Sequence, residues 1–415
     1  MATTTSDSPV VWVWLSGLTE PVPAGILSRR AGASDLSFRY GEQYRERADA
    51  ISLYGMPLDG PTWHPATANL GMPAAIRDAS PDSWGRRVIL HRIKPTSEDT
   101  AELDEMTYLM QSGSNRPGAI DFQASTRLYV PRAETATLDE LLDAAELVEQ
   151  GKPLSEHLER ALLYGTAIGG ARPKALLTEN GQQLIAKFST TTDSYDVVGA
   201  EAASIYLASQ LGIPVTQARV VHSMGRKVLL LDRFDRDASG ARRMVVSALT
   251  MLRLPETFMA SGSYPELLDV LSRESRVAKW LGESIYRRAA FNIAIGNTDD
   301  HLRNHAAFWD GTHLELTPAY DLSPVLRSGE TASQALSLTW ANDRTSSLAV
   351  LVDAAADYKL DRPAAREIAE EVVETVRRHW SAAADFAELT GPQRDLMWGR
   401  MFANPGSVWM AASNI

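Results

Sequence analysis

Hydrophobic positions along the chain change their pattern partway, and the change predicts a strand-rich first part and a helical last part. Up to about residue 130, short apolar runs are separated by Gly, Pro and Asp, as at residues 10–15, 50–54 and 127–130. Runs of this length indicate strands, so we expect a β-rich N-terminal domain with a few short helices. Residues 10–15, Val-Val-Trp-Val-Trp-Leu, are expected to form a buried strand.

A β-hairpin is the sharpest local prediction in the middle of the chain. Residues 174–179 and 182–188 are joined by Asn180-Gly181, a pair that supplies the positive φ angles of a type I′ turn. Strand alternation then puts Ile185 and Lys187 on one face, opposite Leu184, Ala186 and Phe188.

Longer periodic segments predict helices, which dominate after about residue 245. Expected helices cover residues 138–150, 199–211, 285–295 and 364–384, and a further buried strand covers 228–234. Gly212 and Gly296 are placed to end two of these helices. The layout predicts an α+β fold, with a β-rich first part and an α-rich last part.

Length and periodicity together suggest three parts. They are a β-rich N-terminal domain at 1–130, a mixed part at 131–245 that begins with a linker at 131–137, and a helical part at 246–415.

Composition and charge narrow the function classes. The chain of 415 residues carries a formal net charge of −11, which argues against a large direct contact with nucleic acid or an anionic membrane. Arg86, Arg87, Arg92 and Lys94 form a local basic cluster, which is read as a solvated helix face. With no cysteine, disulfides, zinc–thiolate sites and thiol nucleophiles are excluded. The apolar run near the start has no preceding basic residues and is too short to span a bilayer, so a cytoplasmic protein is expected.

Residues 296–304, Gly-Asn-Thr-Asp-Asp-His-Leu-Arg-Asn, carry the strongest chemical signal. Phosphoryl transfer needs a carboxylate near the substrate hydroxyl and oxygen ligands for Mg²⁺. The protein-kinase catalytic loop spaces its Asp and its metal-binding Asn five positions apart, as Asp299 and Asn304 are spaced. Asp300 misses this spacing by one. A polar loop that uses Asn and Asp for turn chemistry is the alternative interpretation.

A second metal ligand and a phosphate-binding loop can be placed on either side of that motif. Asp321, within Leu-Thr-Pro-Ala-Tyr-Asp-Leu-Ser-Pro at 316–324, follows a predicted hairpin through Asp310-Gly311 and suits the second magnesium ligand, although a turn role is common for such an Asp. Residues 165–174, Gly-Thr-Ala-Ile-Gly-Gly-Ala-Arg-Pro-Lys, include small residues that allow backbone N–H groups to approach phosphates, although a Gly-Gly pair alone is weak.

Lys187 and Glu201 are candidates for the ion pair that active kinases assemble. Glu201 shares one helical stripe with Ile205 and Ala208, where an unpaired charge would be costly. Each residue taken separately is more typical of a solvated charge. The order along the chain strengthens the interpretation, because glycine loop, lysine, glutamate, catalytic pair and metal aspartate follow the order of kinase chemistry.

These segments resemble the HipA family of toxin kinases, which are the toxins of bacterial toxin–antitoxin pairs. The resemblance is carried by Gly-Gly-Ala-Arg-Pro-Lys at 169–174, Ile-Ala-Lys-Phe at 185–188, Arg-Phe-Asp-Arg at 233–236, Asn-Thr-Asp-Asp-His-Leu-Arg-Asn at 297–304, Pro-Ala-Tyr-Asp-Leu-Ser-Pro at 318–324 and Pro-Asp-Ser-Trp-Gly-Arg-Arg at 81–87. It implies a Ser/Thr protein kinase that uses ATP and Mg²⁺. The implied fold is a two-lobed protein-kinase-like core with an N-terminal β-rich subdomain at 1–130, a kinase N-lobe at 131–245 and an all-α C-terminal lobe at 246–415. It also implies a small DNA-binding antitoxin as partner, and an aminoacyl-tRNA synthetase is the kind of protein substrate known in the family.

The resemblance also implies roles for single residues. Asp299 would be the base, and Asn304 and Asp321 the magnesium ligands. His301 would support the catalytic loop. The implied ATP contacts are Gly169, Gly170 and Ala171 in the glycine-rich loop, Lys187 at the phosphates, and Asp232 and Phe234 around the adenine.

The sequence departs from the best-known members in two places. Their autophosphorylated Ser is replaced by Ala167, with Thr166 beside it as a possible acceptor, and residues 247–265 lack a Gln-Glu-Asp element. The chain therefore resembles a divergent subgroup. A pseudokinase that acts as a binding module with a DNA-binding antitoxin, and a small-molecule phosphotransferase, are the alternative functions. The intact set of Lys187, Asp299, Asn304 and Asp321 argues against the pseudokinase.

Overall fold

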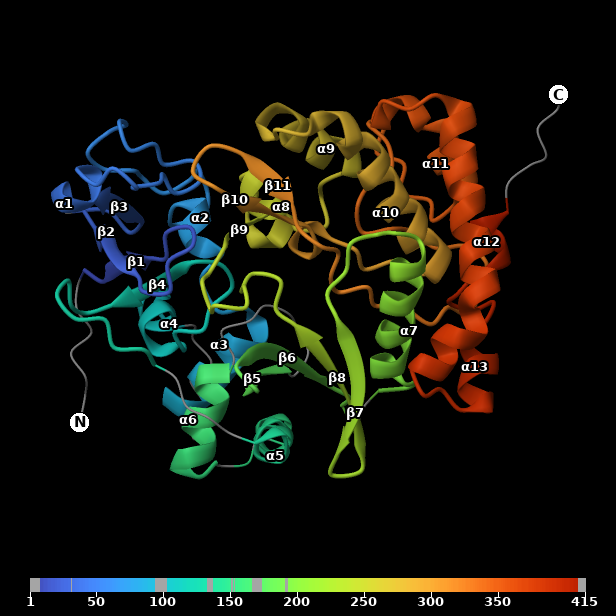
Figure 1. Ribbon diagram of the computed structural model, residues 1–415, viewed down its shortest axis with the longest axis horizontal. Coiled ribbons are helices and arrows are strands. Elements are labelled where there is room, and N and C mark those ends of the chain that lie inside the picture. The colour runs from blue at the N-terminus through green and yellow to red at the C-terminus, as the bar shows by residue number, and fades with distance from the viewer. Residues whose placement is uncertain are drawn as a thin grey trace. The chain divides into compact units, whose positions relative to one another are not determined.

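Apolar strands and helices form two separate sets of contacts in the computed structural model of the chain, shown in Figure 1. The structure describes residues 8–30, 32–93, 103–132, 137–150, 152, 154–165, 174–190 and 193–409. Unit 1 comprises Met1–Thr190, His222–Val246 and Phe308–Thr312, and unit 2 comprises Thr191–Val221, Ser247–Ala307 and His313–Ile415.

The N-terminal part of unit 1 is built on an antiparallel four-stranded sheet in the order β3-β2-β1-β4. Strand β1 (Val10–Val13) is paired on both sides and entirely buried, as its unbroken apolar run predicts. The core around it includes Val11, Leu27, Phe38 and Phe122. The other elements are β2 (Val22–Arg29), β3 (Leu36–Tyr40), α1 (Glu42–Arg45), α2 (Ala74–Arg77), α3 (Ser83–Ile93), α4 (Glu105–Gln111) and β4 (Ile120–Gln123).

Two of the strands predicted for this part do not form, so these two predictions are wrong. Residues 50–54 contribute only an isolated bridge between Leu53 and Met56, and residues 127–130 form no strand. Their apolar side chains are used in loop packing instead: Ile51 and Tyr129 pack against the core without joining the sheet. A short apolar run is therefore compatible with either outcome.

The second sheet of the chain has the order β5-β6-β8-β7 and contains the predicted hairpin. Strands β5 (Lys174–Glu179) and β6 (Gln182–Phe188) pair with Lys174 opposite Lys187. The turn residues Asn180 and Gly181 have φ angles of 50° and 82°, which confirms the left-handed turn geometry. Strand β8 (Arg226–Asp232) follows β6, and β7 (Ala218–Ser223) begins in unit 2 and ends in unit 1.

Helix α5 (Leu138–Glu149) begins at Thr137, which forms a capping box with Glu140 and explains why the predicted helix starts at 138. Helix α6 (Glu156–Gly165) follows it. Strands β9 (Met244–Ser247), β10 (Ala306–Trp309) and β11 (Leu314–Leu316) form a small sheet in the order β11-β10-β9. Gly311, with φ 98°, lies in the turn of the predicted hairpin between β10 and β11.

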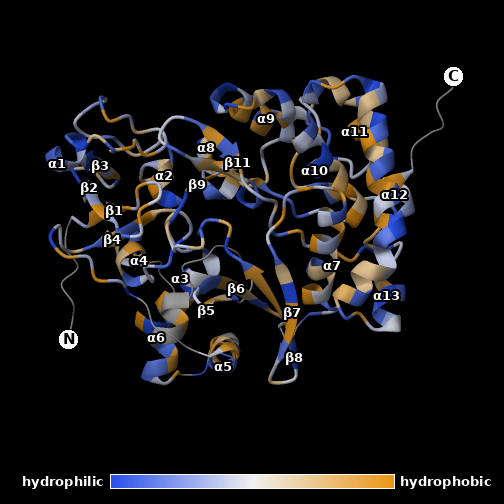
Figure 2. Cartoon of the chain, viewed as in Figure 1, coloured by the Kyte–Doolittle hydropathy of each residue, from blue (hydrophilic) through white to orange (hydrophobic). Residues whose placement is uncertain are grey.

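Unit 2 is largely helical. Its longest helix, α12 (Arg362–Phe386), alternates apolar and polar residues along its length (Figure 2) and packs against α7 (Val197–Gln210) and α10 (Leu281–Ile295). Beyond these it contains α8 (Ala248–Met251), α9 (Tyr264–Glu274), α11 (Leu348–Asp353), α13 (Gly391–Met397), α14 (Pro405–Val408) and the 3₁₀ turns η1 (Glu256–Phe258), η2 (Ala278–Trp280), η3 (Leu302–Asn304) and η4 (Ala355–Tyr358). No helix in the described ranges is long and apolar enough to cross a membrane.

Helix α7 differs in detail from its prediction. Glu201, Ile205 and Ala208 were expected to form one apolar stripe, but nearly every residue from Val197 to Ala208 is buried. The predicted boundary at residue 245 assigned this helix to the N-lobe, whereas its contacts place it in unit 2. The extents of the three predicted domains remain a prediction.

Candidate active site

The predicted catalytic loop begins where α10 must stop. Gly296 caps this helix in the left-handed conformation, with φ 73°. A Cβ at this position would lie 2.8 Å from the Met401 carbonyl oxygen, so a larger residue would clash as well as strain the backbone. The helix end therefore fixes where the loop starts and how residues 297–304 leave the helix.

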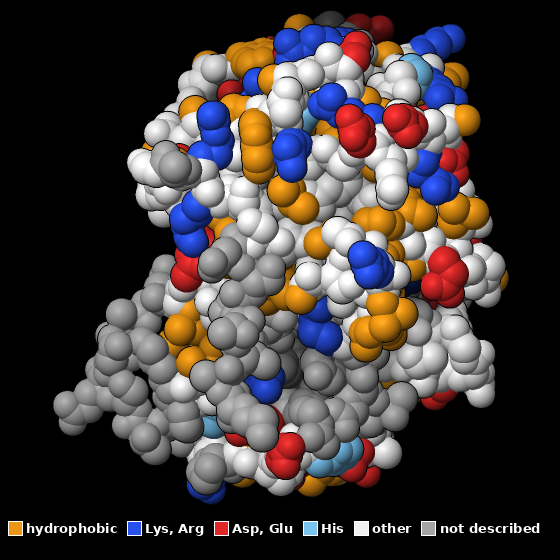
Figure 3. All heavy atoms as spheres, turned by 90° about the vertical axis from the view of Figure 1, so that its left-hand side faces the viewer, with side chains coloured by type: hydrophobic (Ala, Val, Ile, Leu, Met, Phe, Trp, Pro, Cys, Tyr) orange, Lys and Arg blue, Asp and Glu red, His pale blue; other side chains and the backbone are white. Residues whose placement is uncertain are grey.

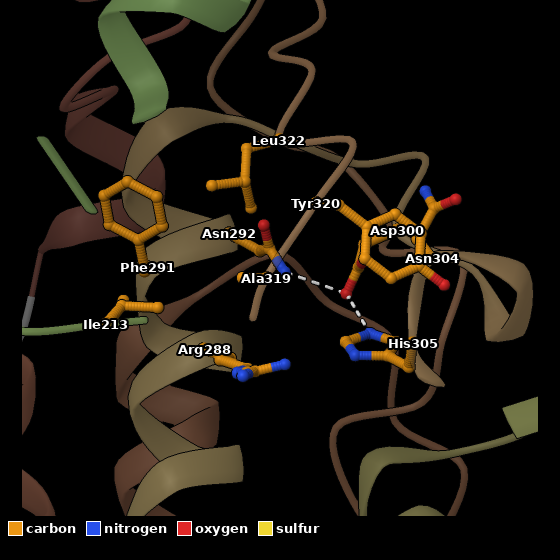
Figure 4. Close-up of a pocket in the computed structure, with 10 residues that line it drawn as sticks. All are labelled: Ile213, Arg288, Phe291, Asn292, Asp300, Asn304, His305, Ala319, Tyr320 and Leu322. Carbon is orange, nitrogen blue, oxygen red and sulfur yellow. Dashed lines mark hydrogen bonds and ion pairs between the residues drawn. The ribbon is translucent and has the colours of Figure 1, made fainter. Parts of the chain in front are cut away.

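Asp300 is buried, and one of its carboxylate oxygens accepts three hydrogen bonds, two of which are drawn in Figure 4. Its Oδ2 atom accepts hydrogen bonds from Asn292 Nδ2 at 2.8 Å, from His305 Nε2 at 2.7 Å and from the Tyr264 hydroxyl. These donors come from α10, from the residue after η3 and from α9. Because this carboxylate ties three parts of unit 2 together, its geometry is that of a structural group.

Asp299 has the opposite environment, with an exposed side chain one residue away. Partial desolvation and the negative charges of Asp321 and Asp300 raise the pKa of Asp299, while the nearby His301 opposes the rise. A carboxylate with increased proton affinity that solvent can reach suits general-base chemistry. Of the two adjacent aspartates, only Asp299 therefore has the surroundings of a base.

Two oxygen-bearing side chains adjoin Asp299. Asn304 is buried, and its Nδ2 donates to the Asp299 carbonyl oxygen at 3.4 Å, while its Oδ1 accepts no hydrogen bond from the described residues. Asp321 lies close enough for its charge to affect Asp299, and it has a φ of 58°, a conformation that Asp tolerates better than most residues. Its carbonyl oxygen accepts from Asn297 Nδ2 at 3.5 Å.

Carboxylate and amide oxygens are the ligands that Mg²⁺ prefers, so this donor set fits a magnesium ion. A cation would also offset the negative charges of Asp321 and Asp300, which add to partial desolvation in raising the Asp299 pKa. Asn304 and Asp321 are the residues that could hold it. In the described part of the chain, no cluster of three or more His, Asp or Glu side chains forms a separate metal site.

A cavity of about 10 Å³ lies behind this loop, close to the size of one water molecule (Figure 4). Its lining combines polar side chains, including Arg288, Asp300 and Asn304, with apolar ones such as Phe291 and Leu322. Arg288 is buried and donates to the Thr317 carbonyl oxygen at 2.5 Å. The cavity is far too small for a nucleotide, so it belongs to the support of the loop.

His301 is partly buried, and its Nδ1 atom has no hydrogen-bond partner among the described residues. Its carbonyl oxygen accepts from the Asn304 N–H at 2.8 Å, which closes the η3 turn. The position is compatible with the predicted supporting role.

The predicted ATP contacts lie on several elements. Lys187 is partly buried on β6 and faces away from the buried Leu184, Ala186 and Phe188, as its alternation predicted. Asp232, at the end of β8, accepts a hydrogen bond of 2.6 Å from Gln182 Nε2. Phe234 packs edge-on against Phe308 with ring centroids 5.9 Å apart.

Glu201 is 4% exposed on α7. Because Lys187 belongs to unit 1 and Glu201 to unit 2, their pairing remains a prediction. The predicted glycine-rich loop, with Thr166, Ala167, Gly169, Gly170 and Ala171, lies outside the residues that the structure describes.

Comparison with known proteins decides the family. The sequence model of the HipA-like C-terminal domain matches residues 166–380, more than half of the chain, and that of the HipA N-terminal domain matches residues 13–123. The chain belongs to the HipA family.

Individual relatives of this HipA-family chain are distant. A Sinorhizobium fredii protein, Y4mE, provisionally named a kinase, is 30% identical over 146 residues, or 33% of each chain. The serine/threonine-protein kinase toxin HipA of Shewanella oneidensis is 25% identical over 186 residues, which cover 38% of this chain and 43% of that protein. The chain thus spans less than half the length of these curated relatives.

The fold is matched over nearly the whole chain. A structure of the Shewanella oneidensis toxin–antitoxin system, described as HipA, HipB and operator DNA, superposes with a TM-score of 0.66 and 18% identity. The match covers 97% of this chain and 100% of the other. It confirms the predicted two-lobed α+β fold.

The sequence prediction missed the residues that hold the catalytic loop in place. Tyr264 and Asn292 lie 36 and 8 residues before Asp300, and no local spacing connects them to it. His305 directly follows the Asp–Asn motif and could have been selected as a polar residue before an apolar strand. Only the fold brings the three donors to one oxygen atom.

The basic cluster on α3 is partly neutralised within the HipA N-terminal domain. Arg86 donates to both carboxylate oxygens of Glu105, at 2.6 and 2.7 Å, and lies over the Tyr108 ring. Arg87 lies over the Trp84 ring, and Lys94 lies outside the described residues. Figure 3 shows basic and acidic side chains intermingled on the face that it presents. The prediction of a solvated helix face therefore holds only in part, because Arg86 forms a partly buried ion pair within the same domain.

Proposed function

We propose that this HipA-family protein is an ATP- and Mg²⁺-dependent Ser/Thr protein kinase. The observation that carries the proposal is the contrast between two adjacent carboxylates. Asp299 is exposed, with a raised pKa, beside Asn304 and Asp321, whereas Asp300 is buried in structural hydrogen bonds. A base beside two magnesium-type ligands is the arrangement that phosphoryl transfer requires.

In the proposed reaction, a Ser or Thr hydroxyl of the substrate lies against the Asp299 carboxylate. As the hydroxyl oxygen bonds to the γ-phosphorus, its proton passes to Asp299, the bond to the β-phosphate oxygen breaks and ADP leaves. Asn304 and Asp321 would hold Mg²⁺, which neutralises charge on the phosphates. His301 keeps the loop in its turn.

The nucleotide would be held by residues of unit 1. Lys187 would contact the phosphates, oriented by Glu201, and the glycine-rich residues Gly169, Gly170 and Ala171 would supply backbone N–H groups. Asp232 and Phe234 would line the adenine. The packing of Phe234 against Phe308 supports this, because it holds an aromatic ring in place two residues after Asp232.

We further propose that the protein is the toxin of a cytoplasmic toxin–antitoxin pair. The kinase-toxin name of one relative and the HipB partner in the matched structure support this. A small DNA-binding antitoxin would be its partner, and a translation component such as an aminoacyl-tRNA synthetase its substrate. With a net charge of −11, the protein would reach DNA through the antitoxin rather than directly.

Purified protein incubated with γ-labelled ATP, Mg²⁺ and a cell lysate tests the kinase proposal. Transfer of label to a discrete protein by the wild type, and its loss in Asp299→Asn, is expected. A matched control is Asp310→Asn, which changes an exposed aspartate in the turn after β10. Equal labelling by wild type and Asp299→Asn would refute the assignment of the base, and no labelling by either would refute the kinase.

A further inference from the structure

A buried cluster of charges in unit 1 joins the HipA N-terminal domain to the segment after β8. It is formed on one side by loop 112–118, which precedes β4, and on the other by residues 233–236, Arg-Phe-Asp-Arg. The same segment carries Phe234 and directly follows Asp232, the two residues assigned to the adenine. Its anchoring therefore bears on the nucleotide site.

Arg233 uses all five of its guanidinium N–H groups. Nε and one Nη2 N–H donate to the two oxygens of Asp235, at 2.9 and 2.7 Å. Nη1 donates to the Asn115 carbonyl and side-chain oxygens at 3.0 and 2.8 Å, and Nη2 also donates to the Arg116 carbonyl oxygen at 2.8 Å. Every N–H group of this guanidinium therefore donates either to loop 112–118 or to the Asp235 carboxylate.

Arg236 repeats the same contacts from the other end of the turn. It donates to the carbonyl oxygens of Arg116 and Gly118, at 2.7 and 3.0 Å, and to Asn115 Oδ1 at 3.1 Å. Asp235 completes the set by accepting the Gly118 N–H at 2.7 Å. Asn115 Oδ1 is therefore an acceptor shared by two arginines.

Positive charge exceeds negative charge within the cluster, because Arg233 and Arg236 share one carboxylate, and burial together with the charge of Arg233 lowers the pKa of Arg236. Burial by itself would raise the pKa of Asp235, but the charges of Arg233 and Arg236 outweigh it and hold that pKa well below its ordinary value. The loop side is equally fixed, because Arg116, with 0% exposure, donates to Asp121 at 2.8 Å and to the Ala79 carbonyl oxygen at 2.6 Å. Buried hydrogen bonds on both sides therefore hold the turn 233–236 against the loop.

Gly118 packs closely against β9, the strand that follows segment 233–236 along the chain. It has a φ of 71°, and a Cβ there would lie 3.0 Å from the Val245 backbone nitrogen. Asn115 also reaches the hairpin of the second sheet, since its Nδ2 donates to Gln183 Oε1 at 2.6 Å. Loop 112–118 thus contacts both the turn after β8 and the strand that carries Lys187.

We propose that the HipA N-terminal domain contributes to nucleotide binding, because Asn115 and Gly118 act as positioning residues for segment 232–236. The inference rests on the proposed function, in which Asp232 and Phe234 bind the adenine. It assigns a role in ATP affinity to residues of a domain that holds no catalytic group. The phosphoryl-transfer step itself would be independent of this loop, because the base and metal ligands lie in unit 2.

The test uses the full chain, with three variants. Asn115→Ala removes the acceptor shared by Arg233 and Arg236, and Asn115→Asp keeps an acceptor oxygen there. Arg86→Met is the control. It removes a partly buried ion pair in the same domain, in which Arg86 donates two hydrogen bonds to Glu105, and it leaves the contacts of segment 232–236 unchanged. Binding of a fluorescent ATP analogue, the KM for ATP, kcat, and amide hydrogen exchange of residues 232–236 are measured for each.

Asn115→Ala should weaken nucleotide binding and raise KM about tenfold, with kcat unchanged and faster exchange at 232–236. Asn115→Asp should restore most of the affinity, and Arg86→Met should bind like the wild type. Wild-type affinity in Asn115→Ala, or an equal loss in Asn115→Ala and Arg86→Met, would overturn the inference. Failure of the wild type itself to bind ATP would instead overturn the proposed function, and unchanged exchange in Asn115→Ala would overturn the anchoring in either case.

Discussion

His305 Nε2 lies 2.7 Å from Asp300 Oδ2, and both side chains are only 3% exposed. The contact joins the residue that directly follows the predicted catalytic loop to the carboxylate next to the proposed base. Asp299 on one side and Asn304 on the other are therefore attached to a rigid internal frame. The two neighbouring aspartates have separate tasks, and this separation is open to a direct test.

Asp299→Asn should reduce phosphoryl transfer at least about 10²-fold, the low end for loss of a general base, while ATP binding and the fold are retained. Asp300→Asn should instead lower stability by about 1–3 kcal/mol, because a buried acceptor of three hydrogen bonds is altered. Kinase assays and thermal unfolding of both variants measure this. Full activity in Asp299→Asn, together with loss of phosphoryl transfer but not of stability in Asp300→Asn, would show that Asp300 is the base.

The metal assignment predicts a changed magnesium requirement. Asn304→Ala and Asp321→Asn each weaken the oxygen donor set, so ATP turnover should need higher Mg²⁺ concentrations than in the wild type. A Mg²⁺ titration of activity measures the shift. A structure with ATP and Mg²⁺ in which neither side chain reaches the ion or its water shell would contradict the assignment.

The raised pKa of Asp299 predicts how stability depends on pH. Because the folded-state pKa lies above the unfolded one, the folded protein binds the proton more tightly, and stability falls as pH rises through the folded-state pKa. Asp299→Asn removes this penalty. Without Mg²⁺ and nucleotide, its melting temperature at pH 7 should exceed that of the wild type, and the difference should disappear below the unfolded pKa near 4. A variant that is less stable than the wild type at pH 7 would show that Asp299 is not in a repulsive environment.

The proposed toxin function predicts a growth phenotype that depends on catalysis. Expression of the protein alone should slow growth, and co-expression of a small partner encoded nearby should relieve it. The Asp299→Asn form should not slow growth, with Asp310→Asn as the matched control. Equal toxicity of the Asp299→Asn form would favour a binding function over a kinase.

Thr166 is the predicted site of self-modification. A phosphate there adds about −2 charge where backbone N–H groups should hold ATP phosphates, so nucleotide binding should fall. Ala167 lacks a hydroxyl, which leaves Thr166 as the nearest acceptor. Intact-mass analysis after prolonged incubation with Mg-ATP should find one phosphate that is absent from Asp299→Asn. An unmodified loop in an otherwise active enzyme would mean that Thr166 only packs there.

The sequence by itself determined the features that depend on neighbouring residues. The hairpin at 174–188 was predictable because Asn180 and Gly181 tolerate positive φ, and the end of α10 because Gly296 does. The spacing of Asp299 and Asn304 was likewise visible along the chain. Short apolar runs such as 50–54 and 127–130 were misjudged, since a run of that length does not reveal whether a partner strand is available.

The tertiary structure alone decided which of two adjacent aspartates is exposed and which residues support the site. Spacing favoured Asp299, but its exposed position, and the burial of Asp300 under Tyr264, Asn292 and His305, come from packing between α9, α10 and the residue that follows η3. The contact of Arg233 with Asn115 joins residues 118 positions apart. Backbone conformation is set by local sterics, whereas burial and charge pairing depend on residues that only the folded chain brings together.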